Sequence, residues 1–389
     1  MPSPTLARFA PCALALVLVA GCVPPGATRV PPPRSESATR LATAPYRVAS
    51  THVRFHDRAR GRVLASTIWW PVDTAWPAPL VVQAHGFLAN RTGGTYVATH
   101  LASRGYVVVA ATHPSTTLFA RGGAQAEDVL LQSGDVSFLI DGMLAADGRH
   151  PRHPPIDPAR IAVMGHSLGG LTATLATFHP RLRDPRIAAA IAMAGPMAML
   201  EPRFFATAPV PFLMIAGTGD VIVDYRRNAL ATLDRVGDGT LVSIAGASHS
   251  GFDDAMTGLP RLLDNPDRIA CRVLTRTLHL GDALAHVRRA TEAGDGIDLA
   301  RVAPPCREPP PLVAMAAVDQ QRITTLAVTA FLESRFAPDP IRRAQAWHYL
   351  TETLPRDFGT VRVATAEAAA AQPSAGGNGR FNAGRGGAR

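Results

Sequence analysis

The pentapeptide GHSLG at residues 165–169 places Ser167 where a strand pattern meets a helix pattern. The apolar run at 160–164 stops at Gly165, and an Ala- and Leu-rich helical run begins directly after Ser167. A serine on such a turn exposes its Oγ as a nucleophile, and the flanking glycines let neighbouring backbones approach closely. The alternative is a small residue at an ordinary strand–helix junction, because this pattern arises easily in a chain with 33 glycines.

A serine hydroxyl needs a base to accept its proton, and the base needs an acid that fixes its tautomer. His249 follows an apolar run and lies in a small-residue loop, which makes it the candidate base. Asp220 follows a second apolar run and a Gly-Thr-Gly turn, and Asp224 is the competing acid. The chain order Ser167, Asp220, His249 is the order of the α/β-hydrolases.

An acyl-transfer site also needs donors for the oxyanion of its tetrahedral intermediate. The amide of Leu168 lies at the N-terminus of the helix that follows Ser167, so we expect it to be one donor. The strand at 80–84 ends in His85-Gly86-Phe87, and the Phe87 amide is the candidate for the second donor. The Phe87 ring could equally wall an acyl pocket or be an ordinary core aromatic.

These residues follow short apolar runs that alternate with helical patterns. Strands are predicted at 62–70, 80–84, 106–112, 160–164, 187–194, 211–216 and 241–245, and helices at 95–103, 126–146, 168–178, 226–235 and 320–336. Nearly continuous apolar strands separated by helices are typical of a mostly parallel sheet covered on both faces. The predicted fold class is therefore α/β, with the α/β-hydrolase fold.

The composition excludes several other kinds of function. The 389 residues carry a formal charge of +9, but every basic residue is Arg, and the arginines are scattered without an aromatic-interleaved patch, so no nucleic-acid partner is expected. Without lysine the chain has no Walker A loop and no Schiff-base nucleophile. The histidines and cysteines form no metal-site signature, so we expect neither a metal nor an organic cofactor.

The N-terminus has the pattern of an export signal. An apolar run at 9–20 ends in Val-Ala-Gly-Cys22, which resembles the lipobox of bacterial lipoproteins. The resemblance implies removal of residues 1–21, acylation of Cys22 and attachment to a membrane; ordinary signal-peptidase cleavage nearby is the alternative. Val23 favours an outer-membrane anchor over retention at the inner membrane, so we expect an exported lipoprotein at the outer membrane that faces the periplasm or the cell surface. Residues 22–45 are rich in proline and are expected to form a tether.

The main domain is predicted at 46–336, with an insertion at 250–318 that fits no core element. The insertion contains Cys271 and Cys306, which we expect to form a disulfide in an oxidising compartment, with two buried free thiols as the alternative. The insertion is expected either to cap the site or to form a remote surface excursion. Residues 337–389 are expected to be a C-terminal extension, largely disordered from about 365.

Several stretches together resemble a known group of enzymes. These are STIWWPV, LVVQAHGFLANR, HLASRGYVVVAATHPST, QSGDVSFLIDGML and RIAVMGHSLGG. They are similar to dienelactone-hydrolase-like proteins related to platelet-activating-factor acetylhydrolase and to cutinase-like polyesterases. The resemblance implies a carboxylic ester hydrolase with Ser167, Asp220 and His249 as triad and the Phe87 and Leu168 amides as oxyanion hole. True dienelactone hydrolases use a cysteine nucleophile, so Ser167 argues against dienelactone as substrate.

The expected function is hydrolysis of a small-molecule carboxylic ester through an acyl-enzyme on Ser167. A thioesterase or peptidase would use the same residues. A non-catalytic surface lipoprotein that keeps the fold as a binding scaffold is the alternative from another class, and a broken triad would be its signature.

Overall fold

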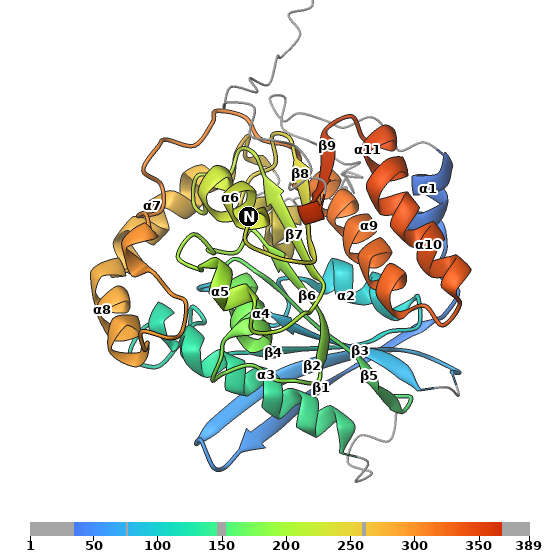
Figure 1. Cartoon of the computed structure of the whole chain (residues 1–389), viewed down its shortest axis with the longest axis horizontal. Helices are drawn as coiled ribbons and strands as arrows, with labels where there is room; N and C mark the ends of the chain where they lie inside the picture. Colours follow the sequence, from blue (N-terminus) through green and yellow to red (C-terminus); the bar gives the residue numbers. More distant parts are fainter. Residues whose placement is uncertain (1–34, 75–76, 146–152, 259–261, 368–389) are drawn as a thin grey trace, which may run out of the picture.

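The computed structural model describes residues 35–74, 77–145, 153–258 and 262–367, which form one nine-stranded sheet with helices on both faces (Figure 1). The strand order is β1-β2-β4-β3-β5-β6-β7-β8-β9. Their bounds are β1 Val48–Asp57, β2 Arg62–Pro71, β3 Ala78–Ala84, β4 Val107–Thr112, β5 Ile156–His166, β6 Ile187–Met193, β7 Phe212–Gly217, β8 Gly239–Ile244 and β9 Val361–Thr365. The pairs from β4 to β8 are parallel, whereas β1, β2 and β9 pair antiparallel with their neighbours. The α/β prediction is confirmed.

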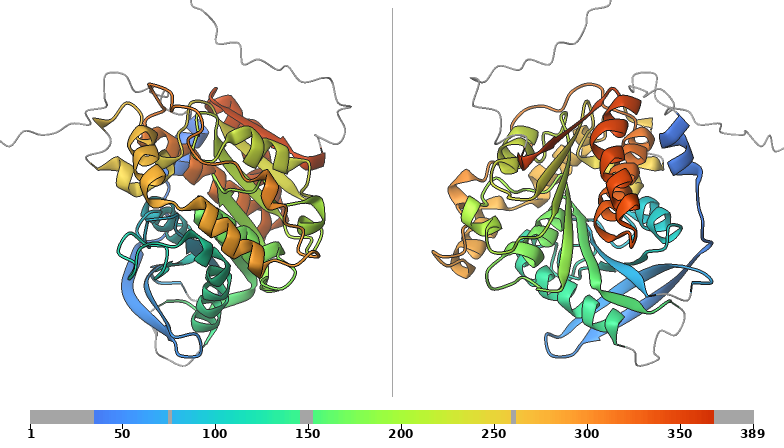
Figure 2. Two further views of the ribbon diagram at one scale, coloured as in Figure 1. Left: turned by 90° about the vertical axis from the view of Figure 1, so that its left-hand side faces the viewer. Right: turned by 45° about the vertical axis from the view of Figure 1, so that its right-hand side comes forward.

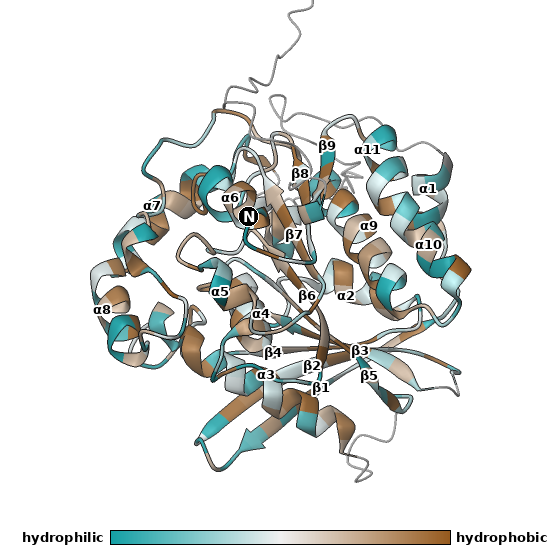
Figure 3. Cartoon of the chain, viewed as in Figure 1, coloured by the Kyte–Doolittle hydropathy of each residue, from teal (hydrophilic) through white to brown (hydrophobic). Residues whose placement is uncertain are grey.

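The central strands are apolar throughout because both of their faces are covered. Every residue of β3, β7 and β8 is buried, and these strands are largely brown in Figure 3 where they are visible. Successive side chains point to opposite faces, so Val82 of β3 joins one core and Val81 joins the other. The sheet thus separates two hydrophobic cores.

Helices complete each core. The first face packs against α3 (Val129–Leu144), α4 (Leu168–Phe178), α5 (Pro202–Phe205) and the turn of η2 (Arg226–Leu230) and α6 (Ala231–Leu233). The second packs against α2 (Thr95–Ala102), α9 (Ala317–Phe336), η7 (Tyr349–Thr353) and α11 (Leu354–Asp357). Figure 2 shows the two helical layers on either side of the sheet.

Both predicted domain boundaries differ from the structure. The expected end at residue 336 lies too early, because α10 (Pro340–His348) and α11 follow, and β9 pairs with β8 from Ile244↔Val361 to Thr240↔Thr365. At the other end, residues expected in the tether form α1 (Ser35–Ala42), where Ser37 Oγ donates to Asp357 Oδ2 at 2.6 Å. Residues 368–389, most of the tail expected to be disordered, lie outside the described residues.

The insertion is helical. It contains η3 (Ser250–Phe252), η4 (Asp254–Thr257), α7 (Asp267–Thr277), α8 (Leu280–Ala290) and η6 (Leu299–Arg301). We call residues 250–318 the cap. In Figure 1 its orange helices lie on the side of the molecule that also carries α3, α4 and α5, and α8 contacts the short helix η1 (Ala126–Asp128). Among the helices of the described residues, none is long and apolar enough to cross a membrane.

Candidate active site

Ser167 sits on a strained turn between β5 and α4. Its backbone has φ +56° and ψ −121°, and its amide donates to the carbonyl of Met193 at 2.9 Å. A Cβ at Gly165 would overlap the Gly169 carbonyl group, and one at Gly169 would overlap the carbonyl of Ala84. Close backbone packing therefore requires glycine at both positions, as expected for a serine exposed on a sharp turn between a strand and a helix.

The structure brings the three predicted residues into one hydrogen-bonded chain. His249 Nε2 lies 2.8 Å from Ser167 Oγ, and His249 Nδ1 lies 2.8 Å from Asp220 Oδ2. The other oxygen of Asp220 accepts from the amides of Ile222 and Val223 at 2.9 and 2.8 Å. Each residue follows the carboxyl end of a parallel strand, which is where this kind of sheet assembles its sites.

The electrostatics favour a charged imidazole at this position. Burial lowers the pKa of His249, but the carboxylates of Asp220, Asp267 and Asp253 outweigh burial, and the net direction is upward. Burial raises the pKa of Asp220, while its contacts with His249 and with backbone amides act against that rise. The ring can thus take up a proton from Ser167 Oγ and hold it beside a buried carboxylate.

The loop between β3 and α2 approaches the serine from the other side. A Cβ added at Gly86 would lie 3.1 Å from Ser167 Cβ. His85 fixes this loop, because its Nε2 accepts from the His113 amide at 2.9 Å and its Nδ1 donates to the Gly86 carbonyl at 2.8 Å. Burial lowers the pKa of His85 to about 3, so the ring stays neutral and keeps this tautomer.

Two backbone amides remain available beside Ser167. In a trans peptide the N–H points opposite to the C=O, so a Gly86 carbonyl held by His85 directs the Phe87 N–H away from His85. Leu168 is the first residue of α4, where amides have no partner inside the helix. Neither amide donates a hydrogen bond to another residue within the described ranges. They match the predicted oxyanion donors in position.

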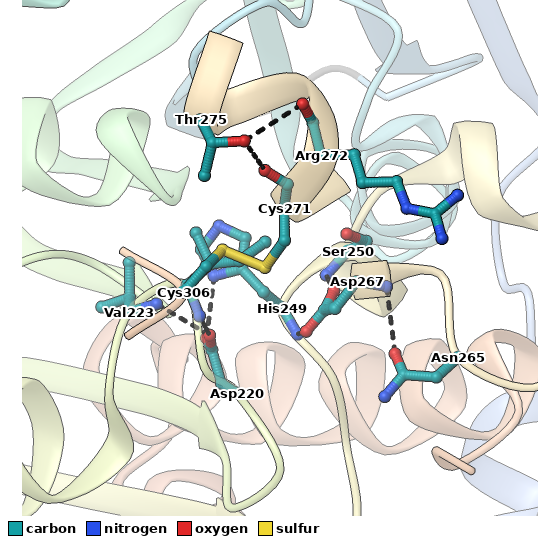
Figure 4. The surroundings of a disulfide bond; sticks show 11 residues. Asp220, Val223, His249, Ser250, Asn265, Asp267, Cys271, Arg272, Thr275 and Cys306 are labelled. Atoms are coloured by element: carbon teal, nitrogen blue, oxygen red, sulfur yellow. Dashed lines mark hydrogen bonds and ion pairs between the residues drawn. A yellow bond between two sulfur atoms is a disulfide. The ribbon is translucent and has the colours of Figure 1, made fainter. Parts of the chain in front are cut away.

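The cap attaches to both loops that carry Asp220 and His249. Cys271 of α7 and Cys306 form a disulfide with a Cα–Cα distance of 5.8 Å, which confirms the predicted pair (Figure 4). The Cys306 amide donates to the carbonyl of Val221, next to the acid, at 2.8 Å. On the same helix as Cys271, the buried carboxylate of Asp267 accepts from the amides of His249 at 2.9 Å and Ser250 at 2.8 Å. Of the two expectations for the insertion, the structure thus places it beside the site.

Sequence reasoning missed the residues that hold the His249 loop. Asp267 is one, and Gln320 of α9 is another: its side chain accepts from the Ser248 amide at 3.1 Å and donates to the Ser248 carbonyl at 2.8 Å. The next residue, Gln321, donates to the carbonyl of Gly251 at 3.3 Å. Their signal in the sequence is limited to two consecutive glutamines near the start of a helix, and the groups that they bind lie about 70 residues earlier in the chain.

The other polar residues considered from the sequence make hydrogen bonds outside the Ser167–His249–Asp220 chain. Asp224, the alternative acid, accepts from the Arg227 amide at 2.8 Å. The Nε2 of His166 lies 3.1 Å from the His249 carbonyl, and burial lowers the pKa of His166 well below its ordinary value. No group of three or more His, Cys, Asp or Glu side chains in the part that the structure describes is placed to hold a metal ion. Cys22, the predicted lipidation site, lies outside the described residues.

Two comparisons with known proteins agree with this geometry. The sequence model of a family described as PET hydrolase-like matches residues 25–263, which include the candidate triad and end before α7. A bis(hydroxyethyl) terephthalate hydrolase of Streptomyces coelicolor is 32% identical over 167 residues, which are 41% of this chain and 49% of that protein. The match therefore spans about half the length of that relative. The expected kinship with polyesterase-like α/β-hydrolases is confirmed, and the chain belongs to the PET hydrolase-like family of ester hydrolases.

Proposed function

We propose that this protein hydrolyses carboxylic esters with Ser167 as nucleophile, His249 as general base and acid, and Asp220 as the carboxylate that orients His249. The observation that carries the proposal is the pair of 2.8 Å contacts that join the three side chains, beginning at a serine on a strained turn. An incomplete triad would favour the non-catalytic scaffold, and all three members are present here. The PET hydrolase-like family match supports the same class of reaction.

The reaction follows from the geometry in two halves. Ser167 Oγ attacks the ester carbonyl carbon while its proton passes to His249 Nε2, and the carbonyl oxygen becomes an oxyanion beside the Phe87 and Leu168 amides. Collapse breaks the bond to the alcohol oxygen, which takes the proton from His249 and leaves as the alcohol. Water then attacks the acyl-enzyme, gives a proton to His249, and the acid is released as the proton returns to Ser167.

The substrate class is an uncharged ester of a small molecule. The relative named bis(hydroxyethyl) terephthalate hydrolase supports esters of aromatic acids among the candidates, but the match covers only 49% of that protein. Thioesters would use the same residues and belong in the substrate panel. No cofactor is needed for any step, because Ser167, His249 and two amides account for each bond and proton.

We also propose that the protein is exported and lipidated at Cys22. The lipobox-like sequence at 19–22 and a disulfide in the cap both suit an oxidising compartment. Mass spectrometry of the mature N-terminus tests this. Cys22→Ser should release the protein from the membrane fraction, and an unprocessed or unmodified Cys22 would refute the proposal.

The experiment for the catalytic proposal compares Ser167→Ala with Ser334→Ala on p-nitrophenyl butyrate. Ser334 is a serine of α9 whose Oγ donates to the Phe331 carbonyl, so it serves as a matched control. We expect Ser167→Ala to lose about 10⁴-fold or more in kcat/KM and Ser334→Ala to match the wild type. A fluorophosphonate probe should label Ser167 alone, as mapped by peptide mass spectrometry. Wild-type activity in Ser167→Ala would refute the proposal.

A further inference from the structure

Two cavities meet at Ser167. The outer pocket has a volume of about 740 Å³ and lies between the Gly86 loop, His249 and the outer face of α7. The inner pocket has a volume of about 180 Å³ and lies beneath α8. Phe87, Ser167, Ile222 and Leu274 line both, so the nucleophile stands at the junction between them.

The inner pocket is apolar on nearly all sides. Its walls come mainly from α4 and from the cap helix α8: Leu168, Leu171, Leu175, Leu280, Leu284 and Val287. Glu127 of η1 is the only charged side chain among the residues that line it in the described structure. An apolar cavity of about 150 Å³ takes up a benzene molecule, so this pocket has room for about six carbons.

The position of His249 decides which part of an ester enters which pocket. The leaving alcohol oxygen must reach His249 Nε2 to take its proton. His249 lines the outer pocket and not the inner one, so the alcohol part has to lie outward. The acyl part then extends the other way, past Leu168 and under α8.

The outer pocket has a different chemical character. Asp253 and Asp254 are among its lining residues, together with Asn90 and Thr92. Burial raises the pKa of Asp253 to about 6, and its Oδ1 accepts from the Ala255 amide at 2.8 Å. With a volume of about 740 Å³, and with apolar side chains beside these polar groups, the outer pocket has room for an alcohol part larger than the acyl part.

We infer that the inner pocket is the acyl site, and that the enzyme selects esters of compact, uncharged carboxylic acids of about six carbons or one aromatic ring. This inference rests on the proposed function of Ser167. A free carboxylate on the acyl part is excluded, because the inner pocket would bury its charge without a partner. The first hydrolysis of a neutral diester of a dicarboxylic acid leaves a monoester whose acyl part carries a free carboxylate. This acyl part would have to enter the inner pocket for a second hydrolysis, so we expect only one ester bond to be cleaved.

The test holds the alcohol constant and varies the acid, using p-nitrophenyl esters with acyl chains of two to twelve carbons. We expect kcat/KM to rise about three- to fourfold for each methylene up to about six carbons and then to fall. A second series holds hexanoate constant and varies the alcohol, where we expect a shallow dependence on length. A third comparison uses methyl benzoate and methyl 4-carboxybenzoate. We expect kcat/KM to be at least 100-fold lower for the charged ester.

Variants of α8 make the assignment specific. Ala283 lines the inner pocket, and Ala283→Leu should move the acyl optimum to shorter chains. Leu284→Ala enlarges the same pocket and should move the optimum to longer chains. Ala285→Leu on the same helix lies outside the lining of both pockets and is the matched control.

Each outcome separates the inference from the proposed function. If Ser167 is labelled by the phosphonate but neither variant moves the acyl profile, the acyl assignment is wrong and the triad stands. If the variants move the alcohol profile, the two pockets have the opposite roles. If Ser167 is not labelled and its alanine variant keeps full activity, the proposed function itself is wrong. Opposite shifts in Ala283→Leu and Leu284→Ala, with no shift in Ala285→Leu, support the inference.

Discussion

Asp267 makes the sharpest prediction, because it holds the backbone at His249, the proposed base, and at Ser250 through two hydrogen bonds. Its buried carboxylate accepts the amides of His249 and Ser250, and the side chain of Asp267 is fully buried. Asp267→Asn keeps one oxygen acceptor and turns an NH₂ group toward the second amide. Leaving one buried amide unsatisfied costs about 1–3 kcal/mol, which corresponds to a Tm lower by about 2–6 °C at roughly 2 °C per kcal/mol.

The same substitution has a catalytic effect with a defined direction. A loop displacement of about 1 Å costs on the order of 100-fold in rate, so we expect kcat/KM to fall about 10- to 100-fold at pH 8. The negative charge of Asp267 helps to raise the pKa of His249. Removing that charge lowers the pKa, so the acid limb of the kcat/KM profile should move to lower pH. Asp253 remains in the variant and continues to raise the pKa of His249.

The assay is a pH profile of p-nitrophenyl hexanoate hydrolysis from pH 4.5 to 9, with thermal unfolding followed in parallel. Asp282→Asn, a change at an exposed aspartate in the first turn of α8, is the matched control. If Asp267→Asn kept the wild-type rate, the acid limb and the Tm, the carboxylate would not position His249. A lower Tm with an unmoved acid limb would leave Asp267 only a structural role.

Three further predictions concern the turn, the acid and the disulfide. Gly169→Ala should destabilise the fold by about 3 kcal/mol or more, because its Cβ meets the backbone of β3, whereas Gly237→Ala meets no atom within 4 Å and should melt like the wild type. Asp220→Asn should lower kcat about 10³- to 10⁴-fold with little change in Tm, since the imidazole loses its tautomer; a fall below tenfold would contradict this. Replacing Cys271 and Cys306 by alanine should cost about 4 kcal/mol for the 35-residue separation and broaden the acyl-length profile, and an unchanged profile would mean that the cap does not shape selectivity.

The sequence predicts the centre of the sheet well and its edges poorly. The runs at 80–84 and 211–216 are apolar at nearly every position because both faces are buried, and this pattern is easy to recognise. Strand β1 is half exposed and contains polar residues at alternate positions, so it carries no continuous apolar run. Strand β9 is five residues long and buried at only one of them, so its own sequence gives a weak pattern and its pairing with β8 identifies it.

The sequence predicts where helices lie better than it predicts where they begin and end. The helical pattern at 269–289 of the cap is continuous in the sequence, but in the structure α7 ends at Thr277 and α8 begins at Leu280. The two residues between them, Leu278 and His279, are neither glycine nor proline, and the nearest helix-breaking residue is Gly281, inside the first turn of α8. The predicted end of the domain at residue 336 is too early because the next helix gives a weak signal: α10 is largely polar and packs through few buried side chains.

The candidate triad could be placed from sequence because each member directly follows a recognisable strand. The residues that hold the triad could not. Asp267 and Gln320 act on backbone atoms through contacts that only the folded chain creates.

Gln320 also bears on how the protein is made. The ribosome completes Ser167, Asp220 and His249 about seventy residues before it reaches the glutamine that holds Ser248 in place. The carboxylate of Asp267 and the partner thiol of Cys271 are likewise synthesised after His249. A nascent chain that ends between 250 and 266 therefore carries Ser167, Asp220 and His249 but none of these supports, and one that ends before 320 still lacks Gln320. The alignment of His249 with Ser167 is therefore completed only after the chain has been synthesised through Gln320, long after the three side chains themselves.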